Sequence, residues 1–400
     1  MILFYISYWG VKEGLTVSTV YPHLKILAQR EDVTAIHFFT VERAEDQKFK
    51  DELPPIPKTS HYPIFSKNMG LHLLTKAADW WRIQSTILAA AKAQKPDFLI
   101  CRSSMASGIG HLVKEKLGIP YMVESFEPHA DYMVESGVWS PNGIKTQFQR
   151  KKEAQTKATA DAIVGVSYNY QQQLIEKEGI SANKVYTVPC TVPLERFAFD
   201  ENKRAETRAK LGLSEDTVIG LYLGKFGDNY YDEEAFRLFK AAADYYQDRF
   251  FFCLLSPAPK AEVKAKLAEV NFPENQYFHD LVAHNEVPNY LSAADFAFSL
   301  VKPTPSRPFS SPIKNGEYWA AGLPILVSLN VGDDSDIIQK EQKGGIIINL
   351  EVPQPNYQDY FKALAPLLAK REEAAELAQK YRSPDQVAEV YDQIIRKLSL

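Results

Sequence analysis

The sequence predicts two successive α/β domains, each a Rossmann-like parallel sheet covered by helices on both faces, that face each other across a cleft. Short apolar runs alternate with longer segments of helical periodicity, as expected for parallel strands joined by helices. The alternation stops in the aperiodic stretch Pro189–Asp200 and then starts again. The length of 400 residues is also sufficient for two domains.

The first domain is expected to span residues 1–190. Its apolar runs predict strands at Ile2–Ser7, Val33–Phe39, Asp97–Cys101, Tyr121–Ser125, Ala162–Ser167 and Val185–Val188. Its periodic segments predict helices at Met69–Gln94, Met105–Leu117, Ile144–Ala158 and Tyr168–Lys177, and one around Val17, Val20, Leu24 and Leu27. The proline-rich segment Leu53–Pro63 is expected to be a loop.

The second domain is expected to span residues 191–382. Its strands are predicted at Val218–Leu223, Phe250–Leu255, Tyr277–His279, Asp295–Leu300, Ile325–Ser328 and Gly345–Ile348. Its helices are predicted at Glu233–Gln247, Lys260–Val270, Val287–Ala293 and Tyr357–Lys370. A last helix, within residues 383–400, is expected to cross back to the first domain.

The composition excludes several classes of protein. A net charge of −4 lacks the basic excess of a general nucleic-acid-binding protein. The three cysteines, Cys101, Cys190 and Cys253, lie far apart in sequence and are interpreted as buried thiols of a reducing compartment. The N-terminus lacks the basic leading region of a signal peptide, and no apolar stretch reaches the roughly 18 residues of a spanning helix. These features predict a cytoplasmic protein.

The most informative stretch is 301–328, VKPTPSRPFSSPIKNGEYWAAGLPILVS, which follows a predicted strand. Ligands of parallel sheets bind beyond the carboxyl ends of the strands. Ser311 can cap a helix there and Pro312 suits its first position, so the free N–H groups and the helix dipole attract an anion. Lys314 adds a positive charge, and Glu317 on the same face can accept the hydroxyls of a ribose. A solvated Lys–Glu pair on an ordinary helix is the alternative.

Motifs along nearly the whole chain resemble glycosyltransferase family 4, the retaining enzymes with a two-domain GT-B fold. GEYWAAGLPIL resembles the signature of the family. Other segments match its pattern in the expected order: KPDFLI with GIPYMVE, ADAIVGVSYNYQQQLIEKEGISANKVYTVP with VPLERF, and HNEVPNYLSAADFAFS.

The resemblance assigns roles to the donor-side residues. Glu317 matches the glutamate that holds the nucleotide ribose, and Lys314 matches the lysine of the pattern Ser-Pro-x-Lys-x-x-Glu. Phe309 stands where many members have a first glutamate, eight positions before the second. The backbone amides of Phe309–Ser311 or the hydroxyl of Ser310 could replace its contact with the donor sugar. Gly224 and Lys225 match the loop that binds the donor diphosphate.

The first domain supplies further candidates. Gly10 and Gly14 match the glycine loop that lies against the donor phosphates, although a glycine-rich turn alone is a weak signal. Glu127 and His129 lie where the family places a residue that orients the transferred sugar, and a partly exposed loop histidine is the alternative for His129. Glu124 resembles a glutamate found in part of the family. The acceptor-side candidates are Trp9, Lys12, Arg102 and Ser103.

The resemblance implies a retaining glycosyltransferase of polysaccharide biosynthesis. It would move a sugar from a nucleoside-diphosphate-sugar to a glycan, lipid-linked or small-molecule acceptor, with no metal, no cofactor beyond this co-substrate and no nucleic-acid partner. The candidate catalytic residues are Glu127, His129, Lys225, Lys314 and Glu317. Asp334 and Asp336 are interpreted as the acidic start of a helix, and His284, which matches a position near the base, as structural.

Two adjacent tryptophans are candidates for peripheral contact with the inner face of the membrane. Trp80 and Trp81 could dock on lipid, but packing of both in the core is the favoured interpretation. Arg150, Lys151 and Lys152 are interpreted as a solvated helix face.

Three competing functions are considered. A catalytically inactive partner protein that binds nucleotide-sugar or glycan is the main alternative, because Phe309 replaces the first family glutamate. An epimerase or phosphorylase on the same fold is another, although the phosphorylase would need a pyridoxal-binding lysine context that is not found. A nicotinamide oxidoreductase is disfavoured because no Gly-x-Gly-x-x-Gly follows either first strand.

Overall fold

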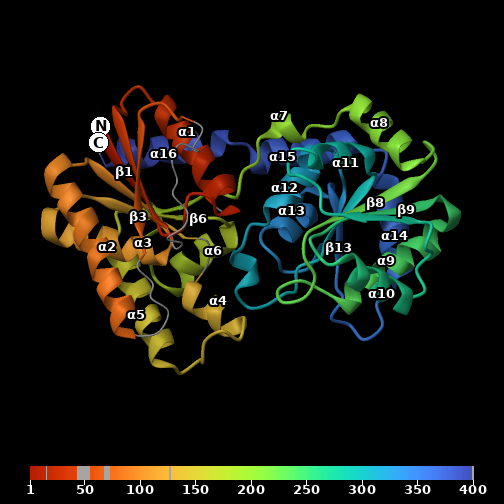
Figure 1. Cartoon of the computed structure of the whole chain (residues 1–400), viewed down its shortest axis with the longest axis horizontal. Helices are drawn as coiled ribbons and strands as arrows, with labels where there is room; N and C mark the ends of the chain where they lie inside the picture. Colours follow the sequence, from red (N-terminus) through yellow and green to blue (C-terminus); the bar gives the residue numbers. More distant parts are fainter. Residues whose placement is uncertain (15, 43–54, 67–72, 126–127, 399–400) are drawn as a thin grey trace. The chain divides into compact units, whose positions relative to one another are not determined.

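The computed structural model describes residues 1–14, 16–42, 55–66, 73–125 and 128–398 (Figure 1). The chain divides into two compact units. Unit 1 comprises Met1–Val188 and Pro384–Leu400, and unit 2 comprises Pro189–Ser383. Each unit contains a parallel sheet with helices on both faces, so the predicted fold class of two parallel-sheet α/β domains is confirmed.

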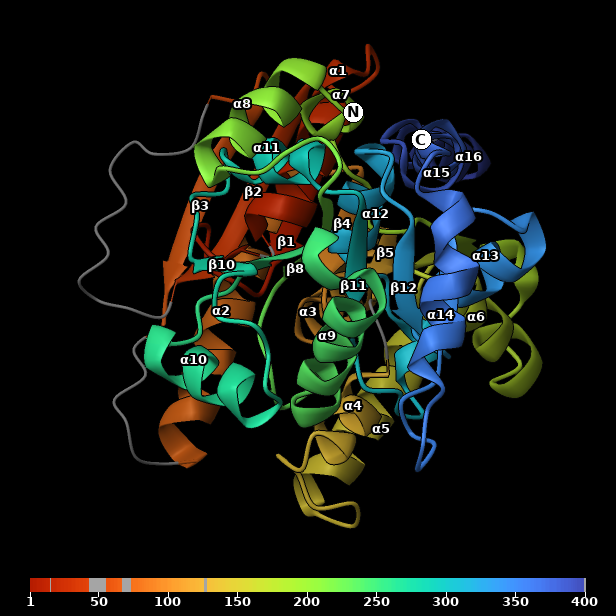
Figure 2. The ribbon, with the colours of Figure 1, turned by 90° about the vertical axis from the view of Figure 1, so that its right-hand side faces the viewer.

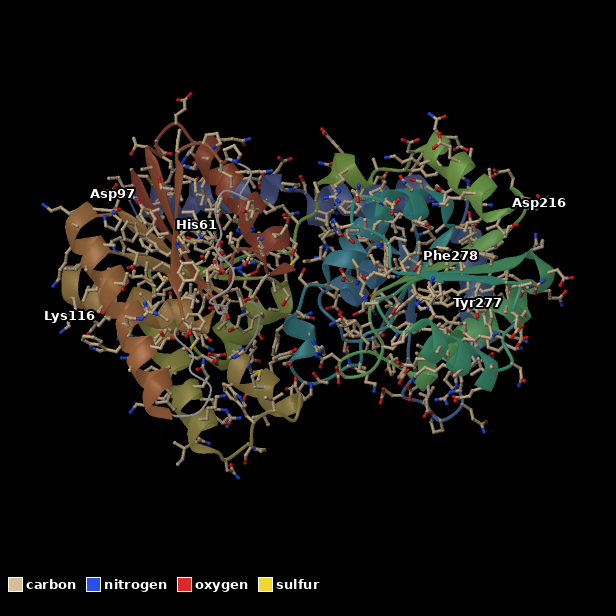
Figure 3. All side chains as sticks on the ribbon, in the orientation of Figure 1. His61, Asp97, Lys116, Asp216, Tyr277 and Phe278 are labelled. Carbon is tan, nitrogen blue, oxygen red and sulfur yellow. The ribbon has the colours of Figure 1, made fainter. Side chains whose placement is uncertain are left out.

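The described part of unit 1 forms a seven-stranded sheet in the order β3-β2-β1-β4-β5-β6-β7. The strands are β1 (Ile2–Ser7), β2 (Ala35–Glu42), β3 (Thr59–Phe65), β4 (Phe98–Arg102), β5 (Tyr121–Glu124), β6 (Ala162–Gly165) and β7 (Val185–Thr187). In the central register, Leu3 of β1 lies opposite Ile36 of β2 and Phe98 of β4. The side chain of Asp97, labelled in Figure 3, accepts a hydrogen bond from the N–H of Ile2 at 2.7 Å and joins the starts of β1 and β4.

Helices cover both faces of this sheet. They are α1 (Tyr21–Gln29), which follows a π-helix at Thr16–Val20, α2 (Leu73–Gln94), α3 (Ser104–Leu117), α4 (His129–Glu135), α5 (Ile144–Thr159), α6 (Tyr168–Gln172) and α16 (Asp385–Lys397). Figure 1 shows α2, α3 and α5 on one side of the sheet and α1 with α16 on the other. The last helix is part of the unit 1 core, because Val387, Tyr391 and Ile394 pack with Leu24 and Leu27 of α1.

Unit 2 contains a six-stranded parallel sheet in the order β10-β9-β8-β11-β12-β13. The strands are β8 (Val218–Leu223), β9 (Phe250–Leu255), β10 (Tyr277–Asp280), β11 (Phe296–Ser299), β12 (Ile325–Ser328) and β13 (Gly345–Ile348). At one edge of the sheet, Phe278 of β10, which is labelled in Figure 3, stacks on Tyr290 with ring centroids 5.6 Å apart.

The helices of unit 2 pack in two layers. They are α7 (Leu194–Phe197), α8 (Glu201–Leu211), α9 (Glu233–Tyr246), α10 (Lys260–Glu269), α11 (Val287–Ala293), α12 (Ile313–Ala320), α13 (Asp334–Glu341), α14 (Tyr357–Leu364) and α15 (Arg371–Arg382). The helices α9, α10 and α14 cover one face over a phenylalanine-rich core that includes Phe239, Phe252 and Phe298. The helices α11, α12 and α15 cover the other, and α12 and α15 lie side by side in Figure 2.

Several elements differ from those predicted. The strand β3 lies in the segment predicted as a proline-rich loop, because Pro63 is tolerated on an edge strand that leaves one side unpaired. The helix predicted at Tyr357–Lys370 ends at Leu364, since Pro366 cannot continue a helix. The short helix α4 and the charged helices α8 and α15 were not predicted. The start of the helix predicted at Met69–Gln94 lies outside the described residues.

The cysteines and tryptophans test two expectations. Cys101, Cys190 and Cys253 are free and buried, as predicted, and burial raises the pKa of the Cys101 and Cys253 thiols. Trp80 packs on Tyr8 at 5.6 Å between ring centroids, but Trp81 is 69% exposed, so the core interpretation is wrong for Trp81. No helix in the described part of the chain is long and apolar enough to cross a membrane.

Candidate functional site

The candidate donor site of unit 2 lies on the loops that follow the paired strands β8 and β11. An isolated antiparallel bridge joins Tyr230 in the first loop to Val301 in the second. The N–H of Lys302 also donates to the carbonyl of Asn229 at 2.9 Å. The two loops are therefore connected at the carboxyl ends of the strands, which is where parallel sheets bind ligands.

The start of α12 differs in detail from the prediction. Pro312 is the N-cap of α12 and the helix has no side-chain cap, so the predicted capping by Ser311 is wrong. The hydroxyl of Ser311 instead accepts hydrogen bonds from the N–H of Cys190, at 3.0 Å, and from the guanidinium of Arg382. Arg382 is buried and requires acceptors there, which explains why the hydroxyl is not available to the helix.

Three buried side chains fix α12 beneath the loops. The hydroxyl of Tyr318 accepts a hydrogen bond from the N–H of Leu223 at 3.0 Å and joins α12 to the end of β8. The amide of Asn315 donates to Asp334 at 2.7 Å, and the indole of Trp319 donates to the carbonyl of Gly344 at 2.8 Å. As expected, Asp334 and Asp336 start helix α13, and Asp334 also pairs with Arg382.

The ammonium of Lys314 lies at the end of β8. It is 3.4 Å from the carbonyl oxygen of Leu223 and lies over the rings of Tyr222 and Tyr230, 5.2 and 4.5 Å from their centroids. A Cβ atom on Gly224, whose φ is +144°, would lie 3.2 Å from this ammonium, so glycine leaves the space that Lys314 occupies. Burial lowers the pKa of Lys314 to about 8, although Glu317 favours the charged form.

The carboxylate of Glu317 lies one helical turn beyond Lys314 and is 10% exposed. His284 lies beside it, with its Nε2 3.8 Å from Oε1 of Glu317. Arg196 donates to Nδ1 of His284 at 2.7 Å and to its carbonyl at 3.0 Å. Because Nδ1 accepts this bond, the neutral ring carries its proton on Nε2, which is directed toward Glu317. The carboxylate is thereby left with acceptor capacity for another hydroxyl.

The remaining donor-side candidates lie on the same loops. Lys225 is exposed directly after Gly224. Phe309 ends a short 3-10 turn, and its N–H donates to the carbonyl of Ser306 at 3.1 Å. The N–H and hydroxyl of Ser310 both donate to the carbonyl of Arg307, at 3.1 and 2.7 Å. These donors are used within the turn, which is evidence against their replacing the first family glutamate.

In unit 1, the loop after β1 is fixed by a residue that the sequence analysis missed. The buried carboxylate of Glu42, at the end of β2, accepts the N–H of Val11 at 3.0 Å. A Cβ on Gly10 would lie 2.6 Å from this carboxylate, so any larger residue there would displace the Glu42 side chain. The available signal for Glu42 was a carboxyl residue three positions after the predicted strand Val33–Phe39. Among the candidates of this loop, Lys12 and Gly14 are exposed and Trp9 is half-buried.

The structure places Arg102 and Glu124 in a buried polar cluster. Glu124 accepts hydrogen bonds from Arg102 at 2.8 Å, Tyr5 at 2.6 Å and Tyr391 at 2.5 Å, and His23 lies 3.3 Å away. Burial opposes the ionisation of Glu124, but Arg102, His23 and the hydroxyl donors outweigh it, so its pKa lies below the ordinary value. Both Arg102 and Glu124 are used inside unit 1, and neither presents a free group to an acceptor.

Ser103 and His129 lie on the loops after β4 and β5. Ser103 caps α3 with φ of +89°, a conformation that non-glycine residues rarely adopt and that is concentrated at functional sites. His129 begins α4, where its ring packs edge-on against Trp139 with centroids 5.6 Å apart, and burial lowers its pKa. Glu127 lies outside the described residues.

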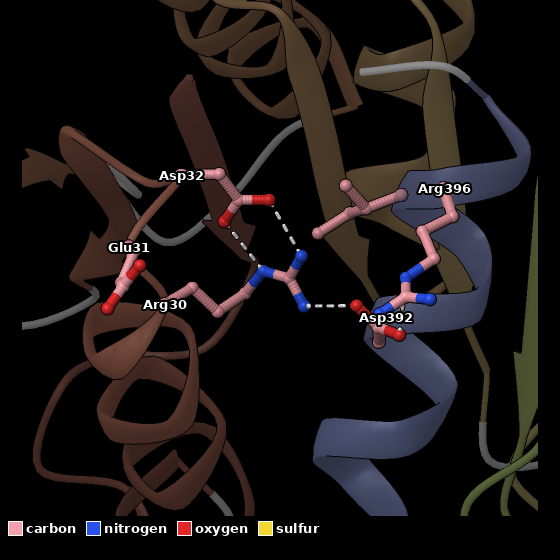
Figure 4. A pocket seen from close by; sticks show the side chains of 6 residues that line it. Arg30, Glu31, Asp32, Asp392 and Arg396 are labelled. Atoms are coloured by element: carbon pink, nitrogen blue, oxygen red, sulfur yellow. Dashed lines mark hydrogen bonds and ion pairs between the residues drawn. The ribbon is translucent and has the colours of Figure 1, made fainter.

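A shallow pocket lies at the other end of the unit 1 sheet. It is lined by Arg30, Glu31, Asp32, Asp392, Ile395 and Arg396 (Figure 4). Arg30 pairs with Asp32 at 2.7 Å and with Asp392 at 3.3 Å, so its charge is compensated within the pocket. The pocket lies between α16 and the segment that joins α1 to β2, and we interpret it as structural. Within the described residues, no cluster of three or more His, Cys, Asp or Glu side chains could hold a metal ion.

Solved structures with the same two-domain architecture identify the fold. The chain superposes on sucrose-phosphate synthase from Thermosynechococcus elongatus with a TM-score of 0.74 and 16% identity, covering 100% of this chain and 99% of the other. HepE of Anabaena in complex with UDP gives a TM-score of 0.71 at 12% identity, covering 99% of each chain. WaaG, a glycosyltransferase involved in lipopolysaccharide biosynthesis, gives 0.67 at 14% identity, covering 98% and 99%. The fold is therefore that of the GT-B glycosyltransferases.

Sequence comparison adds similarity to one family. The model of Glycosyltransferase Family 4 matches residues 18–196. A protein of Bacillus subtilis (strain 168) that bears the name teichuronic acid biosynthesis glycosyltransferase TuaC is 25% identical over 264 residues, which is 65% of this chain and 60% of that protein. The match thus spans less than two thirds of this relative. The resemblance of the chain to glycosyltransferase family 4 is confirmed.

Proposed function

We propose that the chain is a retaining glycosyltransferase that moves a sugar from a nucleoside-diphosphate-sugar to a glycan, lipid-linked or small-molecule acceptor. The observation that carries this proposal is the arrangement of Lys314 and Glu317, a cation and a carboxylate one helical turn apart at the carboxyl ends of β8 and β11. An ammonium suits the diphosphate, and a carboxylate with unused acceptor capacity suits the ribose hydroxyls. The family match and the solved complexes of HepE with UDP and UDP-glucose support this donor class.

The proposed reaction requires stabilisation of the leaving group. The bond between the anomeric carbon and the diphosphate oxygen breaks, and a bond to the acceptor oxygen forms on the same face of the sugar. The proton of the acceptor hydroxyl passes to the leaving diphosphate, so no protein nucleophile is needed. Lys314 and Lys225 would stabilise the negative charge that develops on the diphosphate, the task that a divalent metal performs in other enzymes. We place this reaction in the cytoplasm.

Substitution of Glu317 tests the proposal directly. Glu317→Gln keeps the shape of the side chain but weakens its acceptor, so UDP affinity should fall by about tenfold to a hundredfold. Isothermal calorimetry with UDP and with 2′-deoxy-UDP measures the effect, and the preference for the ribose form should disappear in the variant. Glu274→Gln, at an exposed carboxylate of the same unit, is the matched control. Equal affinity of wild type and Glu317→Gln for UDP would contradict the assignment.

A binding protein without catalytic activity is the second candidate function. It is favoured by Phe309 and by the local use of the donors around it, which leave the donor sugar without the first family glutamate. Binding of UDP-glucose or another nucleotide-sugar without release of nucleoside diphosphate, across a panel of donors and acceptors, would support this candidate. Release of nucleoside diphosphate in the presence of an acceptor would exclude it.

A further inference from the structure

Helix α5 has its two large apolar side chains on its solvent-exposed face, whereas a helix that only packs on a sheet would bury them. Ile144 and Phe148, four residues apart on one side of the helix, are 91% and 60% exposed. The buried positions hold polar residues instead: Thr146, Gln149, Thr156 and Lys157. Burial of apolar surface normally drives the opposite orientation, so the exposed pair requires an explanation.

The buried polar face fixes this orientation. Thr146 donates to the carbonyl of Ser140 at 2.7 Å, and Lys157 donates to Glu178 at 2.5 Å. The carboxylate of Glu153 accepts from the amide of Gln149 at 2.8 Å and from the N–H of Ala130 in α4 at 3.1 Å. Rotating α5 to bury Ile144 and Phe148 would break these partly buried bonds, which is costly.

Lysines surround the exposed apolar pair. Lys145 lies over the ring of Trp139 at 4.2 Å, and Lys152 lies over the ring of Phe148 at 5.8 Å. Arg150, Lys151 and Lys152 are exposed as predicted, and Arg150 also pairs with Asp131 at 2.7 Å. Val138, in the segment before α5, is 63% exposed. The α5 patch is defined here by Val138, Ile144, Lys145, Phe148, Lys151 and Lys152.

We propose that the α5 patch docks on an anionic membrane surface. Exposed aliphatic and aromatic side chains surrounded by lysines match the interfacial helices that lie on membranes, with apolar groups among the acyl chains and cations at the headgroups. A helix that joins two parallel strands runs antiparallel to them. Helix α5 therefore begins at the carboxyl ends of the strands, the same end of the sheet that carries the loops of Trp9 and Ser103. The proposal goes beyond sugar transfer by assigning the membrane-binding surface, and it suits a lipid-linked acceptor.

Vesicle binding by the full chain tests the proposal without donor or acceptor. Wild type should sediment with vesicles of phosphatidylglycerol and phosphatidylcholine, and binding should weaken at least tenfold without the anionic lipid or in high salt. Phe148→Glu and Ile144→Glu should each reduce binding at least tenfold. The matched control is Val352→Glu, at an apolar residue of unit 2 that is 40% exposed, and it should bind like wild type.

Other outcomes would overturn the proposal. Loss of binding in Trp81→Glu but not in Phe148→Glu would assign the membrane contact to α2. A wild-type dimer that Phe148→Glu converts to a monomer, without vesicle binding by either, would assign the patch to a second copy of the chain. Equal binding by wild type and both α5 variants would exclude the patch. Hydrogen exchange of the β4 and β5 amides shows that unit 1 of each variant is folded. Calorimetry with UDP on the same samples tests the donor site of unit 2 independently.

Discussion

At the scale of single residues, the candidate donor site depends on one lysine in a partly dehydrated position. Lys314 is surrounded by the rings of Tyr222 and Tyr230 and by the backbone at the end of β8. Burial lowers its pKa from 10.5 to about 8, so most molecules carry the charge at neutral pH but few do at pH 9. Because a bound diphosphate favours the charged form, binding should raise this pKa again.

The affinity for UDP should therefore depend on pH through Lys314. The pKa is lower in the free protein than in the complex, so affinity is full below pH 8 and falls as pH rises through the free-protein pKa. We expect the Kd to rise about tenfold between pH 7 and pH 9, measured by calorimetry. Lys314→Arg keeps the charge and should show a flat profile. A similar slope in both proteins would assign the titration to another group.

At the scale of secondary-structure elements, the last helix is joined to the sheet by a buried carboxylate. Tyr391 of α16 donates to Glu124 of β5, and Arg102 of β4 and Tyr5 of β1 bind the same group. Three strands and a helix from the far end of the sequence thus meet at one side chain. Glu124 resembles a glutamate found in part of the family, and its contacts indicate that it fixes these elements of unit 1.

Glu124→Gln should destabilise unit 1. The substitution leaves Arg102 buried without a counter-charge, so the free energy of unfolding should fall by about 3–5 kcal/mol. Tyr391→Phe removes one hydrogen bond to the carboxylate and should cost about 1.5–3 kcal/mol. Urea unfolding followed by hydrogen exchange in unit 1 measures both effects.

The same carboxylate predicts the response of unit 1 to acid. Its pKa is lowered in the folded state, so its contribution to stability is present above the ordinary value of 4.5 and is lost as pH falls below it. Glu124→Gln should reduce this acid sensitivity. A variant as stable as wild type at pH 7 would show that the cluster contributes little.

At the scale of the whole molecule, the chain comprises two units with separate cores. Every donor-side candidate except Gly10 and Gly14 belongs to unit 2, and the acceptor-side candidates belong to unit 1. A ligand that binds only one folded unit stabilises that unit by mass action, by about 2.7 kcal/mol at a hundred times its Kd.

UDP should therefore protect the two units unequally. At saturating UDP, slowly exchanging amides of unit 2, such as those of β8 and β11, should gain about a hundredfold protection in hydrogen exchange. Amides of β4 and β5 in unit 1 should change far less. Glu317→Gln, measured at the same UDP concentration, should lose most of the gain. Protection confined to unit 1 would place the nucleotide site there.

The strand pattern was predictable because each buried strand is a short apolar run. Ile2–Ser7, Val218–Leu223 and Ile325–Ser328 were predicted at their observed bounds. The strand β3 was not, because Pro63 suggests a loop and only its edge position makes the proline tolerable. The charged helix α8 has too few apolar residues to show a period.

The candidate site was predictable where residues are brought together by one helix, as Lys314 and Glu317 are by α12. Contacts that depend on distant segments were not predictable. Nothing in the local sequence of Ser311 indicates that Arg382 binds its hydroxyl. Glu42 and Arg196 act through residues far away in sequence, on Val11 and His284, and Arg102 becomes an internal partner of Glu124 only in the folded sheet.

The buried thiols give each unit its own chemical reporter. Cys101 lies in β4 of unit 1 and Cys253 in β9 of unit 2, both essentially inaccessible and with raised pKa. A thiol reagent can reach either cysteine only when the sheet around it opens. Labelling followed by peptide mass spectrometry therefore measures the opening rate of each unit separately. The native chain can thus be followed at two places without adding a probe.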